Sequence, residues 1–405
     1  MKVADLLAQL IRDVAGVELP IRIRAWDGSE AGPANAPVLV VRSRRALRRL
    51  LWAPGEMGLA RAYVTGDLDV EGDLGDGLRR AWRVGRARPA ARLTPRQRVK
   101  AAALAARLGA VGPPPKRPAS EARLTGRLHT RKRDIAAIAH HYDLSNEFYE
   151  LLLDEHMAYS SAFFTDADQS LHDAQTAKLD MICRKLELQQ GQRLLDVGCG
   201  WGSLILHAAR HYGVRALGVT LSAEQRDFVA HRIAEQGLAD RVEVRRQDYR
   251  ELGCQHAQFD AVGSVEMGEH VGEQQYPTYV DVMHRVLKPG GRLLLQQMSR
   301  GENTAPGGGP FIEAYIAPDM HMRPLWRTLK YVQDGGFEVR HVEAMREHYV
   351  RTAEHWLATL EKNFDRFVAL QGEEVARVWR LYLVGGALAF EQGRMGVDQI
   401  LAVKS

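Results

Sequence analysis

The sequence contains few cysteines. Among its 405 residues only Cys183, Cys199 and Cys254 are cysteine, and no two of them form a Cys-x-x-Cys pair. This scarcity excludes a disulfide framework and a cysteine-rich zinc site, and it is typical of reduced thiols in a cytoplasmic protein.

Long apolar runs are also absent. No stretch of about 18 apolar residues occurs, so we expect no membrane-spanning helix. The first residues, MKVADLLAQLIRDVAGVEL, are interrupted by Asp5, Arg12 and Asp13, which is unlike a secretory signal. Hydrophobic residues nevertheless make up 45% of the chain, which is ample for a large core and for two domains.

Acidic residues are nearly absent between Arg79 and Arg133. This tract holds 17 Lys or Arg and one acid, Glu121, so its net charge is +16 and the rest of the chain carries −11 of the total of +5. Such a basic tract favours a polyanionic partner, either a nucleic-acid backbone or an anionic lipid surface, and the alternative is a solvated linker.

Three regions are predicted along the chain. Residues 1–78 alternate the strand-like runs IRIRAW and PVLVVR with a helical segment, which predicts a small α/β domain. Residues 79–133 form a basic helical segment, and its Pro-rich stretch GPPPKRPAS cannot continue a helix. Residues 134–405 form the third region, which we expect to be the catalytic domain.

The third region alternates apolar runs with helix-like stretches. This alternation predicts the α/β class, a doubly wound and mostly parallel sheet. In such sheets ligands bind at the carboxyl ends of the strands. The expected strands are LLDVGC, VRALGVT, RVEVRR, FDAVGSV and GRLLLQQM.

A glycine-rich loop, DVGCGWG, ends the first of these runs. Glycines at 198, 200 and 202 permit a tight turn and a close approach of the backbone to a ligand. A dinucleotide fingerprint would need glycine where the chain has Ser203. The loop with its leading Asp196 resembles motif I of class I S-adenosylmethionine methyltransferases, which implies their seven-stranded sheet and a loop that contacts the amino-acid end of the cofactor.

Polar residues end the second and third runs. Thr220 and Gln225 of GVTLSAEQ could bond the ribose, and Gln247 and Asp248 of QDYR could meet the adenine. Each could instead be a helix cap or a solvated turn, because Ser222 and Gln225 have capping-box spacing.

The stretch HYDLSNEFYELLLDEHMAYSSAFF, residues 141–164, indicates the family. With DVGCGWG, GVTLSAEQ, QDYR and MGEHVG it closely resembles cyclopropane-fatty-acyl-phospholipid synthases and mycolic-acid methyltransferases over about residues 134–405. The resemblance implies transfer of a methyl group from S-adenosylmethionine to the double bond of an unsaturated acyl chain, through a carbocation. The implied cofactor contacts are Tyr159, Ser160, Asp196, Gly198, Gly200, Gly202, Thr220, Leu221, Gln225, Gln247 and Asp248.

The residues around the implied base depart from the family pattern. In cyclopropane-forming members the resemblance implies a bicarbonate base, held by a Cys, a Glu, a His and a Tyr. This chain keeps the glutamate as Glu269 and the tyrosine as Tyr382, from LYLVGGALAF, but it has Ser161 and Gln296 at the other two positions. Glu266 stands where the family usually has glycine.

The stretch SVEMGEHVG therefore contains the main catalytic candidates. We hypothesise that Glu266 supplies a carboxylate in the space of the bicarbonate, and that the two neighbouring glutamates raise the pKa of one of them toward that of a useful base. His270 is a further candidate in the same stretch. The alternatives are a solvated loop acid and a metal site of these three residues, and we expect no metal because no other ligand is evident nearby.

The altered base favours a 10-methylene fatty acyl product over a cyclopropane, which stays the alternative. Methylene products are precursors of 10-methyl chains such as tuberculostearate, and a separate flavin-dependent reductase would act on them. The resemblance makes an oleoyl-type phospholipid the substrate. It also places the basic tract against the anionic inner face of the cell membrane, and the oligomeric state, including a homo-oligomer, stays open.

Two stretches rich in aromatic, Met and Leu residues are expected to line a lipid pocket or simply to form core. They are FIEAYIAPDMHMRPLW (311–326) and EHWLATLEKNFDRFVAL (354–370).

Two other functions are weighed and disfavoured. Enzymes that methylate exocyclic amines of nucleic acids usually carry an N-P-P-Y-like tetrapeptide after the fourth strand, where this chain has SVEMGEHVG, so we expect no nucleic-acid partner. A lipid-binding protein with an inactive cofactor fold disagrees with the intact glycine loop.

Overall fold

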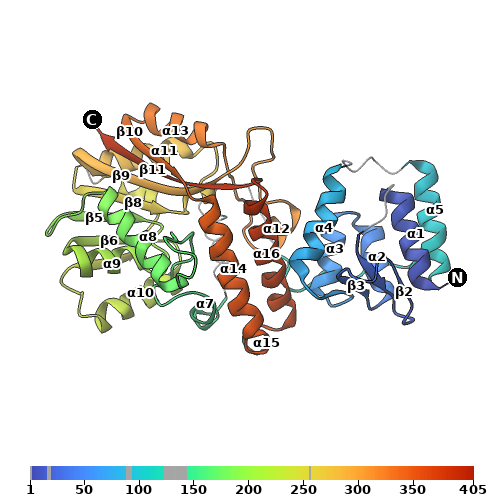
Figure 1. The fold of residues 1–405 in the computed structure, drawn as a ribbon. Helices are drawn as coiled ribbons and strands as arrows, with labels where there is room; N and C mark the ends of the chain where they lie inside the picture. Colours follow the sequence, from blue (N-terminus) through green and yellow to red (C-terminus); the bar gives the residue numbers. More distant parts are fainter. Residues whose placement is uncertain (1, 16–19, 88–93, 123–132, 134–143, 255–256) are drawn as a thin grey trace. The chain divides into compact units, whose positions relative to one another are not determined.

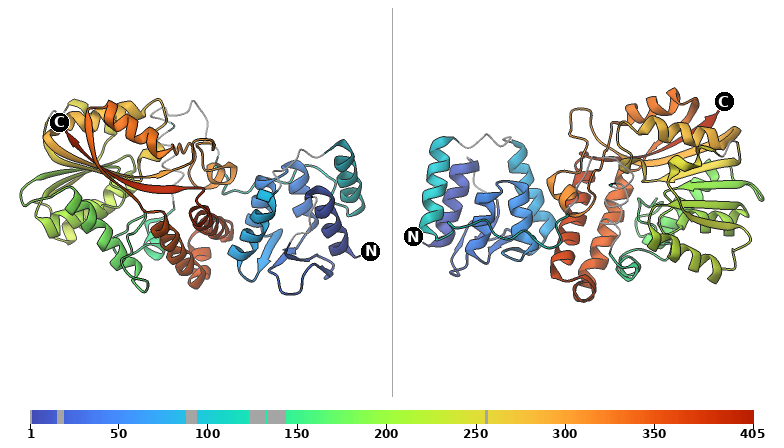
Figure 2. Two further views of the ribbon diagram at one scale, coloured as in Figure 1. Left: turned by 45° about the horizontal axis from the view of Figure 1, so that its top comes forward. Right: turned by 180° about the vertical axis from the view of Figure 1, so that it is seen from behind.

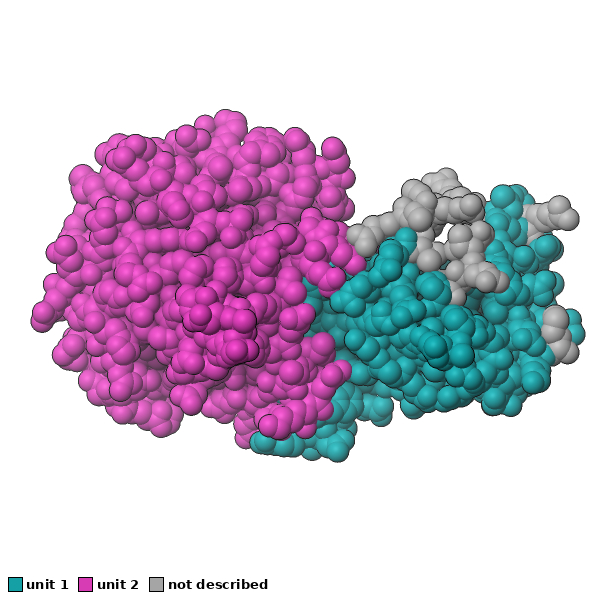
Figure 3. Space-filling model, in the orientation of Figure 1, with its two compact units in different colours: residues 1–121, 364–388 teal, residues 122–363, 389–405 magenta. Residues whose placement is uncertain are grey.

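The computed structural model describes residues 2–15, 20–87, 94–122, 133, 144–254 and 257–405 (Figure 1). The chain forms two compact units, coloured separately in Figure 3. The first unit contains residues 1–121 and 364–388, and the second contains residues 122–363 and 389–405.

The first unit contains a four-stranded sheet in the order β2-β1-β3-β4. Strand β1 pairs parallel with β3, while β2 and β4 are antiparallel to their neighbours, so the unit is α/β as predicted. Its strands are β1 (Arg22–Arg24), β2 (Glu30–Ala31), β3 (Val38–Val41) and β4 (Leu68–Glu71). Its helices are α1 (Val3–Ala15), α2 (Arg44–Trp52), α3 (Glu56–Val64), α4 (Leu74–Ala87), α5 (Pro95–Arg107), α15 (Phe364–Gln371) and most of α16 (Glu373–Glu391).

Helix α16 is far from the rest of the first unit in sequence. Its Arg377 is 5% exposed and donates through Nε to the carbonyl of Tyr63 at 2.6 Å and through Nη2 to that of Leu68 at 2.9 Å. The guanidinium also pairs with Asp69 at 3.2 Å. These buried bonds attach residues 364–388 to the N-terminal sheet, whereas the sequence analysis assigned them to the third region.

The basic tract does not form a separate body in the described residues. Helices α4 and α5 both belong to the first unit, and Gln97 of α5 donates to the carbonyl of Asp13 on α1 at 2.8 Å. Thr94 and Gln97 form a capping box that starts α5. Residues 88–93 and 123–132 of the tract lie outside the described residues.

The second unit is built on a seven-stranded sheet in the order β10-β11-β9-β8-β5-β6-β7. The five strands from β9 to β7 pair in parallel, and β11 is antiparallel to both of its neighbours. The predicted doubly wound, mostly parallel sheet is confirmed, and each expected run forms a strand. The strands are β5 (Arg193–Val197), β6 (Arg215–Thr220), β7 (Val242–Arg246), β8 (Phe259–Val265), β9 (Leu287–Ser299), β10 (Phe337–Ala344) and β11 (Gly396–Lys404).

Helices cover both faces of this sheet (Figures 1 and 2). One core cluster packs α8, α9 and α10 against it, and another packs α11 and α13 against the opposite face. Burial on both faces explains why the central parallel strands β5, β6 and β8 are mainly apolar. The helices are α7 (Asn146–Leu152), α8 (Leu171–Lys185), α9 (Ser203–Tyr212), α10 (Ala223–Glu235), η1 (Tyr249–Cys254), η2 (Gly268–His270), α11 (Tyr276–Val286), α12 (Pro310–Tyr315), α13 (Leu325–Asp334) and α14 (Arg346–Lys362).

The strand order places the site. The chain runs outward from β5 through β6 to β7 and then returns to β8 on the other side of β5. The carboxyl ends of β5 and β8 therefore flank the point where the winding direction reverses, which is where such sheets bind ligands. The glycine loop and SVEMGEHVG follow these two strands. None of the helices among the described residues is both long and apolar enough to cross a bilayer.

Candidate active site

A pocket opens at the carboxyl ends of β5, β6 and β8. Segments 157–160, 196–204, 219–225 and 265–270 contribute to its wall, together with Lys178 of α8. Nine of the predicted cofactor residues line this pocket: Tyr159, Ser160, Asp196, Gly198, Gly200, Thr220, Leu221, Gln225 and Gln247.

The other two predicted cofactor residues are not in the pocket wall. Gly202 begins α9 in a left-handed conformation with φ of 84°, and a Cβ there would lie 2.9 Å from Val229. Asp248 is 5% exposed and is bound by the guanidinium of Arg250 at 2.6 Å. Both residues shape the loops around the pocket, and their direct contact with the cofactor stays a prediction.

Two glycines of the loop after β5 are required for different reasons. Gly198 has φ of 81°, and a Cβ on it would lie 2.6 Å from Cγ of Met267, in the loop after β8. Gly200 has φ of 52°, and a Cβ there would meet nothing within 4 Å. The first glycine thus lets the two loops touch, and the second leaves room for a ligand beside the backbone.

Two buried polar atoms in the wall have no hydrogen-bond partner in the protein, Oδ1 of Asp196 and Nε2 of Gln225. Burial raises the pKa of Asp196 to about 7, while the nearby Lys178 acts to lower it. The Gln225 amide is oriented by the Thr220 hydroxyl, which donates to its Oε1 at 2.7 Å. Buried polar atoms are normally satisfied, so these two fit a ligand with a cationic amine and with hydroxyl groups.

Lys178 is a site residue that the sequence analysis missed. It is 1% exposed, and its Nζ donates to the hydroxyl of Ser160 at 2.9 Å. Burial lowers the pKa of Lys178 to about 8, and the carboxylates of Glu266, Asp154 and Asp196 oppose that shift. Nothing in the sequence distinguishes it, because a lysine in an amphipathic helix usually faces water.

Glu266 is the centre of a hydrogen-bonded cluster at the pocket wall. Its Oε1 accepts from the backbone N–H of Ser161 at 2.8 Å and from Nε2 of Gln296 at 2.9 Å. Its Oε2 accepts from the hydroxyl of Tyr349 at 2.8 Å. The structure therefore brings together Ser161, Gln296 and Glu266, which the sequence analysis had named from three separate segments.

The amide of Gln296 is held in one orientation. Its Oε1 accepts from Nε2 of Gln399 at 2.8 Å, and Oε1 of Gln399 accepts from Lys185 at 2.7 Å. This chain of bonds directs Nε2 of Gln296 toward Glu266. Fixed donors of this kind favour the charged form of a carboxylate.

Tyr349 of α14 provides the tyrosine hydroxyl on Glu266, and the sequence analysis did not name it. Tyr382 lies on α16 in the first unit, where its ring packs edge-on against Trp379 with centroids 5.5 Å apart. The catalytic role of Tyr382 stays a prediction.

Glu269 is enclosed more completely than Glu266. It is 1% exposed, its Oε1 accepts from the backbone N–H of Met298, and its Oε2 has no hydrogen-bond partner. Burial and the charge of Glu266 raise the pKa of Glu269 to about 8. Burial also raises the pKa of Glu266, but three donors counteract it. Glu269 therefore keeps its proton near neutral pH, while the three donors on Glu266 favour the charged form of that carboxylate.

His270 also lines the pocket. Burial lowers its pKa to about 4. The imidazole is therefore neutral near pH 7 and is not a source of a proton there.

The contribution of Glu269 to the free energy of unfolding should fall as the pH rises from 4.5 to 8. In this window unfolded Glu269 releases its proton at its ordinary pKa of 4.5 while the folded protein keeps it up to about 8, so stability present below pH 4.5 is lost through pH 8. Over this range the Glu269→Gln variant should lose less free energy of unfolding, or gain more, than the wild type, whereas exposed Glu302→Gln should follow the wild type. Urea unfolding at several pH values checks this, and equal slopes in all three proteins would contradict it.

The chain is similar in sequence to known proteins. The family model described as "Mycolic acid cyclopropane synthetase" matches residues 129–400. The chain belongs to this family. A probable fatty acid methyltransferase of Mycobacterium tuberculosis is 39% identical over 394 residues, which cover 95% of this chain and 91% of that protein. The cyclopropane-fatty-acyl-phospholipid synthase of Escherichia coli (strain K12) is 37% identical over 274 residues, 68% of this chain and 69% of that protein.

Solved structures give the same family. A crystal structure of mycolic acid cyclopropane synthase CmaA1 complexed with SAH and CTAB matches with a TM-score of 0.62 at 32% identity, over 67% of this chain and 98% of that one. The second unit of this mycolic acid cyclopropane synthetase family member thus has the class I S-adenosylmethionine-dependent methyltransferase fold.

Proposed function

We propose that this chain methylates the double bond of an unsaturated phospholipid acyl chain, that Glu266 takes the proton released, and that the product is a 10-methylene chain. Family membership makes it an S-adenosylmethionine-dependent methyltransferase that acts on lipid acyl chains. The arrangement around Glu266 is the observation on which the finer proposal depends.

The pocket residues fit the cofactor. Asp196, with its unpartnered carboxylate oxygen, would hold the cationic amine, and the loop through Gly200 would lie along the amino-acid end. Gln225, oriented by Thr220, would donate to a ribose hydroxyl. Bound there, the cofactor supplies an electrophilic methyl group on a sulfonium.

The acyl chain then requires a base. An alkene that gains a methyl group becomes a carbocation, and a neutral product forms only when one proton leaves. Oε2 of Glu266 accepts a single bond, from Tyr349, so it has a lone pair available for that proton. Glu269, protonated and uncharged, leaves Glu266 as the anion that stabilises the cation.

The position of the base determines the product. Loss of a proton from the new methyl group with ring closure gives a cyclopropane. A hydride shift to the cationic carbon, followed by loss of a proton from the new methyl group, gives a methylene branch (C=CH₂) on the chain. We favour the methylene because Glu266, Ser161 and Gln296 change the residues that would otherwise hold bicarbonate. A flavin-dependent reductase could then saturate the new double bond.

The two products have the same mass, so NMR must separate them. Purified protein with S-adenosylmethionine and an oleoyl phospholipid should give the olefinic signals of a methylene branch on the acyl chain. A cyclopropyl resonance upfield of the ordinary methylene envelope would refute the proposed product and leave the methyltransferase assignment intact.

The first unit carries a surface that fits an anionic membrane. Five large apolar side chains are exposed in the described part of the first unit: Leu51 at 42%, Trp52 at 58%, Leu59 at 46%, Val99 at 69% and Val111 at 62%. Trp52 donates to the carbonyl of Gly112 at 3.0 Å, which links the end of α2 to the segment after α5.

Cations occur on the same segments as these apolar side chains. Arg44 and Arg48 of α2 have no acidic partner among the residues that the structure describes, and Arg107 and Lys116 lie exposed nearby in sequence. Apolar side chains among cations suit a bilayer with anionic headgroups. We therefore propose the inner face of the cell membrane as the partner.

Replacing Leu51 and Trp52 with serine should weaken binding to phosphatidylglycerol vesicles by at least about tenfold, because both side chains lose apolar burial. The control is Trp326→Ser, which removes a 46% exposed tryptophan from the second unit. Sedimentation with phosphatidylglycerol and phosphatidylcholine vesicles measures the difference. Equal vesicle binding by both variants would contradict the proposed surface. So would a Leu51 and Trp52 double variant that keeps its vesicle binding but no longer associates with a second copy of the chain.

A further inference from the structure

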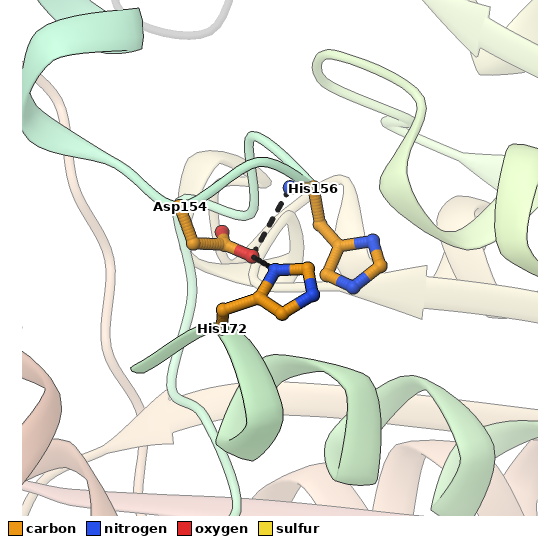
Figure 4. Close-up of side chains that lie close together, drawn as sticks. All are labelled: Asp154, His156 and His172. Carbon is orange, nitrogen blue, oxygen red and sulfur yellow. Dashed lines mark hydrogen bonds and ion pairs between the residues drawn. The ribbon is translucent and has the colours of Figure 1, made fainter. Parts of the chain in front are cut away.

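A cluster of two histidines and an aspartate lies beside the pocket (Figure 4). Asp154 and His156 belong to the loop after α7, and His172 belongs to the first turn of α8. One potential ligand atom from each lies within 4.8 Å of the other two. Nδ1 of His172 is 3.7 Å from Oδ2 of Asp154, and the two imidazole rings are parallel with centroids 4.7 Å apart.

Asp154 is held in place before any ligand arrives. Its side chain is 2% exposed. Oδ2 accepts from the backbone N–H of His156 at 3.1 Å, and Oδ1 accepts from that of Ala158 at 3.2 Å. Each oxygen keeps a further lone pair, and the carboxylate cannot turn away without breaking both bonds. This is how outer contacts orient a metal-ligating carboxylate.

His172 has an unsatisfied nitrogen on the side facing Asp154. Its Nδ1 is buried and has no hydrogen-bond partner, although the side chain as a whole is 43% exposed. A buried polar atom without a partner needs an explanation. The exposed part of the ring gives an ion a path from solvent.

The hydrogen bonds of Thr176 identify the protonated nitrogen of His156. The Thr176 hydroxyl donates to the carbonyl of His172 at 3.0 Å, so its only proton is used. With the hydroxyl proton placed there, Nε2 of His156, 2.8 Å from the same oxygen, is assigned as the donor, which leaves Nδ1 with a lone pair. An ion bound through Nδ1 preserves the Thr176 bond, as is common for ligating histidines.

We propose that Asp154, His156 and His172 bind a divalent transition-metal ion, Zn²⁺ foremost. Two imidazoles and a carboxylate are ligands that Zn²⁺ accepts, with water as the fourth. Bonds of about 2 Å put tetrahedral ligand atoms ~3.4 Å apart. The 3.7 Å pair is close to that spacing. Because nitrogen lone pairs lie in the ring planes and the two rings are parallel, the His156 ring must move inward and turn out of its stacked orientation to share the ion.

Such an ion would connect two parts of the pocket. The loop of Asp154 and His156 continues into Tyr159 and Ser160 of the pocket wall, and α8 carries Lys178, which bonds Ser160. The ion would tie the loop to this helix at its exposed end. We therefore expect it to raise the thermal stability of the second unit.

Calorimetric titration of tag-free, chelator-treated full-length protein with ZnCl₂ tests the proposal. One equivalent should bind, with an affinity at least about tenfold lower in His172→Gln and in His156→Gln. His231→Gln is the matched control, because His231 is 73% exposed and pairs with Glu235 one turn along α10. Zn²⁺ should raise the melting temperature of the wild type and of the control, but not of His172→Gln.

Cobalt provides a second measurement that does not depend on the variants. Co²⁺ in the wild type should give visible bands of a tetrahedral N/O site without the intense thiolate band that cysteine ligation would add. Absence of stoichiometric binding, a thiolate band, or unchanged affinity in folded His172→Gln and His156→Gln would each overturn the proposal.

Discussion

Turnover should fall by at least about two orders of magnitude when Glu266 is replaced by glutamine, because the amide cannot accept a proton. Glutamine has nearly the same shape, so the contacts of Ser161, Gln296 and Tyr349 can be kept. Rates of methyl transfer to an oleoyl phospholipid measure the effect. The loop variant Glu302→Gln removes an exposed acid and should retain the wild-type rate.

The Glu266→Gly variant tests the role of the carboxylate as a base without disturbing the fold. Glu266 has φ of 52°, a conformation that glycine adopts freely, so this variant should fold well. It should be inactive in bicarbonate-free buffer and regain part of the rate when bicarbonate is added, because the vacated space again fits that anion. Full activity of the glycine variant without bicarbonate would refute the role of Glu266.

Replacing Lys178 with methionine should lower the free energy of unfolding by about 3–5 kcal/mol, because it leaves buried acids without their cation. Lys178 is 1% exposed, and Glu266, Asp154 and Asp196 all interact with its charge. Urea unfolding should be followed on the transition that S-adenosylhomocysteine shifts, since that transition reports the second unit.

Lys330→Met is the matched control for this experiment. Lys330 is 62% exposed and pairs with Asp334 one turn along α13, and such surface pairs contribute only about 0.5 kcal/mol. If Lys178→Met and Lys330→Met unfold at the same urea concentration, the buried ammonium does not balance the acids of the pocket.

Features encoded by a local pattern could be predicted from the sequence. The runs that became β5, β6 and β8 are mainly apolar because helices bury both faces of the sheet. The glycine loop and Glu266 directly follow β5 and β8, so the general rule for doubly wound sheets was enough to place them at one site. Ser161 and Gln296 were named through the family motifs, and both are buried beside Glu266.

Features that depend on distant packing could not be predicted. Tyr349 reaches Glu266 from a helix 83 residues further along the chain, and a tyrosine in an amphipathic helix carries no sign of that contact. Lys178 reads as a surface residue until α8 is packed against the loop of Ser160. The proton on Glu269 is likewise a consequence of enclosure and of a neighbouring charge, neither of which a sequence displays.

The buried bonds of Arg377 to Tyr63 and Leu68 have a consequence for biosynthesis. During translation, the N-terminal sheet emerges from the ribosome long before its partner helix α16. The carbonyls that Arg377 will bond are hydrogen-bonded to water while the more than two hundred intervening residues are synthesised. Folding of the first unit can therefore be completed only after synthesis of nearly the entire chain, and a fragment that ends before α16 should be a substrate for chaperones and proteases.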